Sequence, residues 1–251
     1  MSPMAIGWFV FALVFGSALL AMYVHSLLPA EHLSSDSKDV VKLGIALIAT
    51  MSALVLSLLV ASAKSAFDTR SNQLTEASAD MIMLDRALAR YGPETQEARA
   101  LLERSVVVTL ERFWPTQGKG SITLDPRTNP VEALYDKLEA LTPQSDAQRS
   151  MKSQALTLAA DVGRMRLLLF EHLGASIPVP FLVVLVFWLC IIFASFGLFA
   201  PRNATVITVL CVCALSVAGA IFLILELDRS FEGLLQVSSA PLRAALAQLG
   251  R

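Results

Sequence analysis

The chain has 251 residues, of which 55% are apolar and only 16% are charged, and its formal net charge is −1. An ordinary soluble domain contains roughly a quarter charged residues, so the composition excludes a soluble enzyme and a disordered chain. The balanced charge also argues against nucleic-acid binding, for which a clustered basic excess supplies the affinity.

Four long runs of the sequence contain no Asp, Glu, Lys or Arg. Each is about as long as the roughly 20 residues that a helix needs to cross the hydrocarbon core of a bilayer. The runs show no alternation of polar and apolar residues, so we expect helices rather than the strands of a barrel. The sequence predicts transmembrane helices over residues 5–28, 41–63, 178–200 and 204–226. The first lacks the basic start of a signal peptide, so we expect it to be retained as a membrane anchor.

Most of the charge falls between the second and third spans, where residues 64–176 carry 14 of the 20 basic and 15 of the 21 acidic residues. Apolar residues recur there every seven positions, which predicts that the second span continues as one helix. These positions are Phe67, Leu74, Met81 and Leu88. Gly92 followed by Pro93 is expected to end this helix.

A second heptad pattern precedes the third span, at Met151, Leu158 and Met165. Between the two patterns we expect a helix over residues 94–113 and a short helix that starts at Pro130. The two heptad patterns have similar lengths and lead out of and into the membrane, so their helices are expected to pack antiparallel. This segment is therefore predicted to form a helical bundle.

The predicted fold is all-α, a polytopic membrane protein with a cytoplasmic helical bundle inserted between the second and third spans. An even number of spans places both termini on the side of the bundle. Lys and Arg are more frequent at the span ends on that side, which favours the cytoplasm and a multi-pass location in the cell membrane. The predicted parts are spans one and two (1–64), the bundle (65–176), spans three and four (177–227) and a C-terminal tail (228–251).

The C-terminal tail contains a short amphipathic helix whose apolar residues are Leu242, Leu246 and Leu249. This apolar face has three possible partners, namely the bundle, a neighbouring subunit and the membrane surface. The sequence leaves the choice among them open.

Small residues follow one another at intervals of four along the second span. They are Ala49, Ala53, Ser57, Ala61 and Ser65. One interpretation is close helix packing, which small side chains permit. The other is that several copies of this face surround a conduit in an oligomer, with Lys64 at the cytoplasmic mouth, where a ring of Lys side chains would attract anions. Asp68, one turn further on, would partly cancel this positive field, so the sequence leaves the sign of the field open.

Three charged residues, Glu226, Asp228 and Arg229, lie at the inner end of the fourth span. An acid within a membrane is a candidate functional residue. Because these acids lie at the predicted boundary, the alternative is a structural ion pair or an anchor at the membrane interface.

The sequence offers no metal or cofactor site and no catalytic constellation. The three histidines, His25, His32 and His172, are far apart, and the three cysteines fall within apolar runs, where they are expected as buried thiols. The sequence shows no grouping of a nucleophile with a base and no set of metal ligands, so we expect neither an enzyme nor a bound cofactor.

Two stretches resemble the bestrophin-like membrane proteins of bacteria. They are KSAFDTRSNQLTEASADMIMLDRALARYGPETQEAR after the second span and ELDRSFEGLLQVSSAPLRAAL after the fourth. The most specific piece runs from Leu227 to Gly233, where the family usually shows Asp-Arg-Pro-Phe-x-Gly and Ser230 takes the proline position. The resemblance extends over nearly the whole chain.

The resemblance implies kinship with bestrophins, which are pentameric anion channels whose second span lines the pore. It therefore implies a homo-oligomer in the lipid bilayer, with five subunits by analogy and small anions as the conducted species. The leading hypothesis is a passive ion channel or channel-like protein. The alternative is a membrane-anchored interaction or scaffold protein whose cytoplasmic bundle binds a partner.

Overall fold

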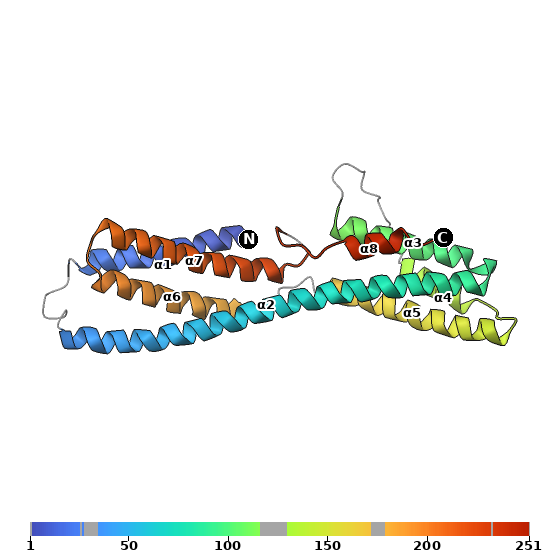
Figure 1. Ribbon diagram of the computed structural model, residues 1–251, viewed down its shortest axis with the longest axis horizontal. Coiled ribbons are helices and arrows are strands. Elements are labelled where there is room, and N and C mark those ends of the chain that lie inside the picture. Colours follow the sequence, from blue (N-terminus) through green and yellow to red (C-terminus); the bar gives the residue numbers. More distant parts are fainter. Residues whose placement is uncertain are drawn as a thin grey trace. The chain divides into compact units, whose positions relative to one another are not determined.

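The computed structural model describes residues 2–25, 27, 35–115, 130–171, 179–231 and 233–250. These residues are mostly helical and include no β-strand, which confirms the all-α prediction (Figure 1). The chain forms two compact units. The first comprises Met1–Ala66 and Ala175–Leu234, and the second comprises Phe67–Gly174 and Leu235–Arg251.

Four helices are long and apolar enough to cross a membrane among the described residues. They are α1 (Pro3–His25), α2 (Ser35–Tyr91), α6 (Val179–Phe199) and α7 (Ala204–Asp228). These helices confirm the four apolar spans predicted from the uncharged runs. Asn203 caps the N-terminus of α7. Its side-chain oxygen accepts a hydrogen bond from the Val206 N–H at 2.8 Å, which satisfies a backbone donor that has no partner within the helix.

Helix α2 is continuous over 57 residues and belongs to both units. This confirms the prediction that the second span continues as one helix. The helix ends at Tyr91 because Gly92 has a φ of 141°, a conformation that favours glycine. A short 3₁₀ turn, η2 (Pro93–Thr95), then leads into α3 (Gln96–Phe113).

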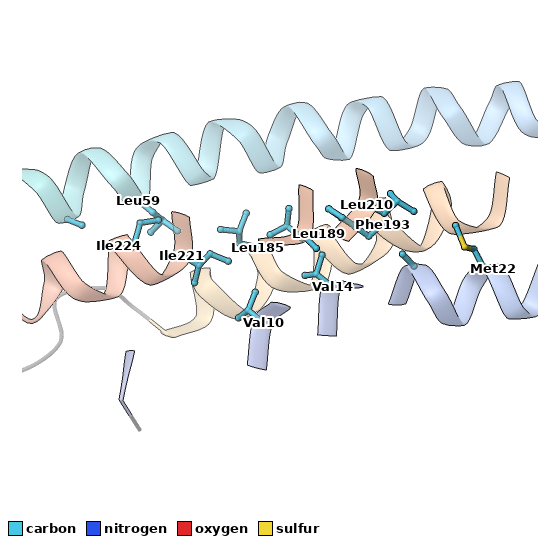
Figure 2. Packing of buried hydrophobic residues seen from close by; sticks show 13 residues of the cluster. Val10, Val14, Met22, Leu59, Leu185, Leu189, Phe193, Leu210, Ile221 and Ile224 are labelled. Carbon is cyan, nitrogen blue, oxygen red and sulfur yellow. The ribbon is translucent and has the colours of Figure 1, made fainter. Parts of the chain in front are cut away.

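The core of the first unit consists of apolar residues from α1, α2, α6 and α7. Figure 2 shows Leu59 of α2 pointing toward Ile221 and Ile224 of α7. Helices α1 and α6 approach so closely that a Cβ atom at Gly197 would collide with the backbone of Ala18. Small residues permit such close packing between helices in a membrane, where dispersion contacts hold the helices together.

The second unit contains the C-terminal part of α2, α3, α4 (Pro130–Glu139), α5 (Asp146–Glu171) and α8 (Ala240–Leu246). All five helices line a cavity of only about 20 Å³, so this core is closely packed. Of the predicted heptad residues on α2, Leu74, Met81 and Leu88 are buried, as expected, and Phe67 is half-buried.

On α5 the centre of the buried face differs from the predicted heptad row. Ala155, Ala159 and Val162 are buried, whereas Met151 and Leu158 are only half-buried. The small side chains allow close contact with the rest of the unit, and the larger heptad residues lie beside this contact on one edge of the buried face.

The C-terminal helix α8 packs on α3 within the second unit. Leu242 and Leu249 are buried, and the Trp114 indole N–H donates a hydrogen bond to the Val237 carbonyl at 3.0 Å. Of the three partners that the sequence left open for this apolar face, the structure places it on the helices of its own chain.

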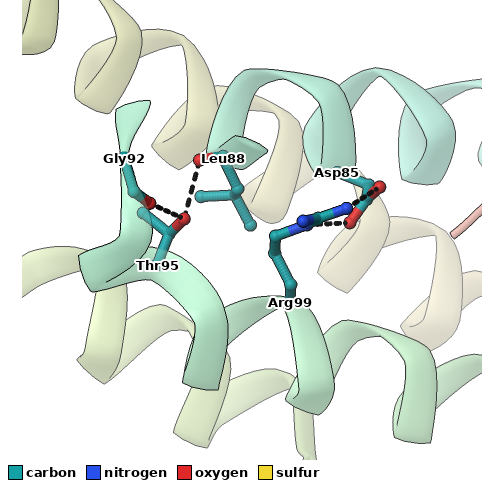
Figure 3. A network of polar contacts seen from close by, with 5 residues as sticks. All are labelled: Asp85, Leu88, Gly92, Thr95 and Arg99. Carbon is teal, nitrogen blue, oxygen red and sulfur yellow. Dashed lines mark hydrogen bonds and ion pairs between the residues drawn. The ribbon is translucent and has the colours of Figure 1, made fainter. Parts of the chain in front are cut away.

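Two polar contacts hold α2 against α3 at the end of the second unit (Figure 3). The Arg99 guanidinium makes a two-pronged ion pair with the Asp85 carboxylate, with N–O distances of 2.7 and 2.9 Å. Asp85 is buried, and the hydrogen bond between the two side chains raises the pKa of Arg99 above its ordinary value. Arg99 therefore stays protonated, and its contact with Asp85 fixes α3 against α2.

The second contact is made by Thr95, which is buried in η2. Its hydroxyl lies 2.6 Å from the Leu88 carbonyl and 2.8 Å from the Gly92 carbonyl, so one hydroxyl hydrogen serves two acceptors. The last carbonyls of a helix have no partner within the helix. Thr95 therefore caps the C-terminus of α2.

We expect Thr95→Val to lower the free energy of unfolding by about 1–3 kcal/mol, because it leaves a buried carbonyl without its donor at nearly constant side-chain volume. The measurement is urea unfolding of the full chain in detergent, followed by circular dichroism. Thr157→Val is the matched control, because the Thr157 hydroxyl donates to the Ser153 carbonyl on an exposed helix surface. Equal losses in both variants would contradict the capping role of Thr95.

Candidate functional site

The small-residue stripe, defined as Ala49, Ala53, Ser57, Ala61 and Ser65, lies on α2 within the first unit. All of its residues are exposed except Ala49, which is half-buried. Residues four apart form a row inclined to the helix axis by about 26°. A row that starts near the neighbouring helices therefore turns outward along α2, and the stripe faces away from the buried side of the helix.

Lys64 lies beside the end of the stripe and is exposed. Its backbone is helical, because α2 continues without interruption past this position. The structure thus places Lys64 at the end of the outward-facing row formed by Ser57, Ala61 and Ser65. The stripe and Lys64 together form a surface of small side chains with a positive charge at one end.

A different face of α2 packs inside the first unit. Ser52, Leu59 and Ala63 are buried there, and the Ser52 hydroxyl donates a hydrogen bond to the Ile48 carbonyl at 2.8 Å. The hydroxyl is satisfied within the helix, so Ser52 packs as a small residue. Sequence reasoning missed this face, because every side of the span is apolar or small and no hydrophobic period marks the buried one.

The span in α2 is the least covered of the four apolar helices. In its most apolar 18-residue window 11% of the residues are buried, against 22–28% in α1, α6 and α7. Most of the apolar surface of α2 is therefore available to lipid or to another subunit.

The three charged residues at the end of α7 differ in their surroundings. Glu226 and Asp228 are buried, whereas Arg229 is exposed. The Glu226 carboxylate accepts a hydrogen bond from the Leu234 N–H. The carboxylate thus holds the segment after α7 back against the helix end.

Gly233 permits this turn, because its φ of 95° favours glycine and a Cβ atom there would collide with the Glu226 carboxylate. Glu226 therefore has a structural role. Both Glu226 and Gly233 belong to the stretch after the fourth span that resembles the family. An ion pair or an anchor at the membrane interface stays a prediction for the three charged residues at the end of α7.

At the opposite end of the first unit, Arg202 caps α1. The guanidinium donates to the Met22 carbonyl and, at 3.4 Å, to the Tyr23 carbonyl. Cations are favourable at this position because the C-terminus of a helix carries partial negative charge. No local pattern in the sequence marks this contact, since Arg202 and Met22 lie 180 residues apart.

Among the residues that the structure describes, no group of three or more His, Cys, Asp and Glu side chains could hold a metal ion. The candidate site is the stripe with Lys64, which offers small side chains, hydroxyls and one positive charge. Such groups suit contact with a hydrated ion.

A family model described as a Bestrophin-like domain matches residues 11–242. This range covers most of the chain and includes the stripe and the three charged residues at the end of α7. Neither a curated protein nor a solved structure matches the chain.

Proposed function

Because the chain belongs to the Bestrophin-like family and carries four helices apolar enough to cross a membrane, we propose that it is a homo-oligomeric channel. It conducts small anions passively, and the stripe on α2 lines its conduit. A passive conduit requires no cofactor and catalyses no reaction. Five subunits follow by analogy with the bestrophins that the sequence resembles.

The observation that carries this proposal is the orientation of the stripe. Ser57 and Ala61 are exposed while Leu59 and Ala63, on the other side of the same helix, are buried. Small residues that filled a contact inside the chain would be buried in the single chain. Their exposure supports a role between subunits, where several copies of α2 would surround an axis.

The charge of Lys64 supports the choice of anions. In an oligomer with α2 at the axis, one ammonium group from each subunit forms a ring at one end of the stripe. A ring of positive side chains concentrates anions and repels cations at a pore mouth. We place this mouth, the second unit and both chain termini in the cytoplasm, on the basis of the Lys and Arg distribution at the span ends.

We expect purified protein in liposomes to release trapped chloride, and Ser57→Trp to abolish the release. Ser57 is exposed, so the larger side chain can be accommodated in the single chain, but an indole from every subunit would fill the conduit. The measurement is chloride efflux with a chloride-selective electrode after dissipation of the membrane potential.

Leu58→Trp is the matched control for this experiment. Leu58 is also exposed and follows directly in sequence, but it points about 100° away around the helix, so its indole would face lipid or a neighbouring helix. Release that equals that of empty vesicles would contradict the channel, and equal block by both variants would contradict the stripe as its lining.

The second candidate function is a membrane-anchored scaffold. The second unit favours it, because this unit has its own closely packed core and can present a constant surface to a protein partner. A scaffold would retain its partner in both tryptophan variants and would show no chloride release in liposomes.

A further inference from the structure

An apolar groove of about 410 Å³ opens between α1 and α7 in the first unit. Gly7 and Ala218 form its buried floor, Phe11 and Phe222 flank it, and Trp8 stands exposed at its rim. None of the lining residues is charged, and the indole N–H of Trp8 is the one polar side-chain group among them.

Two glycines shape this groove in opposite ways. A Cβ atom at Gly7 would lie 3.3 Å from the Cβ of Phe222, so Gly7 is where α1 and α7 approach each other. A Cβ atom at Gly219 would have no neighbour within 4 Å. The helices are therefore in contact at the floor, and open space begins above Gly219.

The position and length of the groove restrict what can occupy it. It is lined by residues from Met4 to Phe11 on α1, and at 1.5 Å per residue these extend about 10 Å along the helix. One half of a bilayer hydrocarbon core is about 15 Å thick. The groove thus lies within one leaflet. A membrane span of a second copy would instead need a complementary face over the whole hydrocarbon core of about 30 Å, which is longer than the groove.

We propose that this groove binds one acyl chain of a bilayer phospholipid. Hydrocarbon is the solvent around membrane spans, and the groove lies within the range of about 300–1,000 Å³ typical of ligand pockets. A chain between Trp8, Phe11 and Phe222 gains dispersion contacts on several sides, more than it would on a convex helix surface. This binding site is separate from the stripe on α2 and does not depend on ion conduction.

The test is native mass spectrometry of the full chain in detergent with added dioleoylphosphatidylcholine. We expect one tightly retained lipid per subunit, and an apparent affinity about tenfold lower in Gly219→Leu, whose side chain fills the groove. Gly16→Leu is the matched control. Gly16 also lies on a membrane span with no atom within 4 Å of its Cβ position, but it is outside the groove.

Lipid retention by Gly219→Leu equal to that of the unmodified chain would overturn the proposal, as would an equal loss in Gly16→Leu. If Gly219→Leu changed the number of subunits in the complex and left lipid binding unchanged, the groove would instead be a contact between subunits. Should Gly219→Leu lose its helical circular dichroism signal, Trp8→Ala provides the second test. This variant removes one wall at the exposed rim, and retention equal to the unmodified chain would also overturn the proposal.

Discussion

Asp85→Ala is expected to lower the free energy of unfolding by about 3 kcal/mol. The substitution removes the carboxylate that pairs with the Arg99 guanidinium, at a site where the Asp85 side chain is 5% exposed and the Arg99 side chain 22%. Removal of one partner from a buried pair typically costs about 3–5 kcal/mol, because the remaining charge is left uncompensated. The partial exposure of Arg99 places the expected value at the lower end. Urea unfolding of the full chain in detergent measures it.

The control for this prediction is the Asp146–Arg149 pair, which has a similar N–O distance of 2.8 Å but side chains that are 94% and 72% exposed. Asp146→Ala should change the free energy of unfolding by less than about 1 kcal/mol. The double variant Asp85→Ala, Arg99→Ala should lose less than the sum of its single variants, because the second substitution removes the charge that the first one leaves uncompensated. Equal effects at Asp85 and Asp146 would contradict a structural role for the buried pair.

Met81→Asp is expected to have a still larger effect, a loss of about 4 kcal/mol or more in the free energy of unfolding. Met81 is 7% exposed in the core of the second unit. The substitution removes the buried side chain and puts an unpaired carboxylate in its place, and both changes are costly. The measurement is again urea unfolding of the full chain in detergent.

Met83→Asp separates burial from other effects of the substitution. Met83 lies on the same helix two residues further on and is 49% exposed, so a carboxylate there can reach water. Its expected effect is within about 0.5 kcal/mol. A loss at Met83 as large as that at Met81 would mean that this face of α2 is not the one that packs in the core.

The helices could be predicted because their signals are local in sequence. Uncharged runs of membrane length marked the four spans, and the absence of Gly and Pro between Gly44 and Gly92 is compatible with one long α2. The heptad row through Leu74, Met81 and Leu88 predicted the buried face of α2 in the second unit, because polar residues on the other sides give the helix a clear hydrophobic period.

The contacts that shape the candidate site could not be predicted in this way. Within the first unit, α2 is apolar or small on every side, so no period distinguishes the buried Leu59 and Ala63 from the exposed Ser57 and Ala61. The cap that Arg202 places on α1 joins residues 180 positions apart. Such pairings depend on the three-dimensional path of the chain, which the composition of a single helix does not encode.

The position of the C-terminal segment has a consequence for the order of folding during synthesis. The second unit is discontinuous, because Leu235–Arg251 completes a core that is otherwise built from Phe67–Gly174. Domains generally fold as units, the N-terminal ones first, as the chain is synthesised. Here the surface of α3 that receives Leu242 stays uncovered until the ribosome has made α6 and α7. The second unit therefore begins to fold before the last two apolar helices exist and finishes after them.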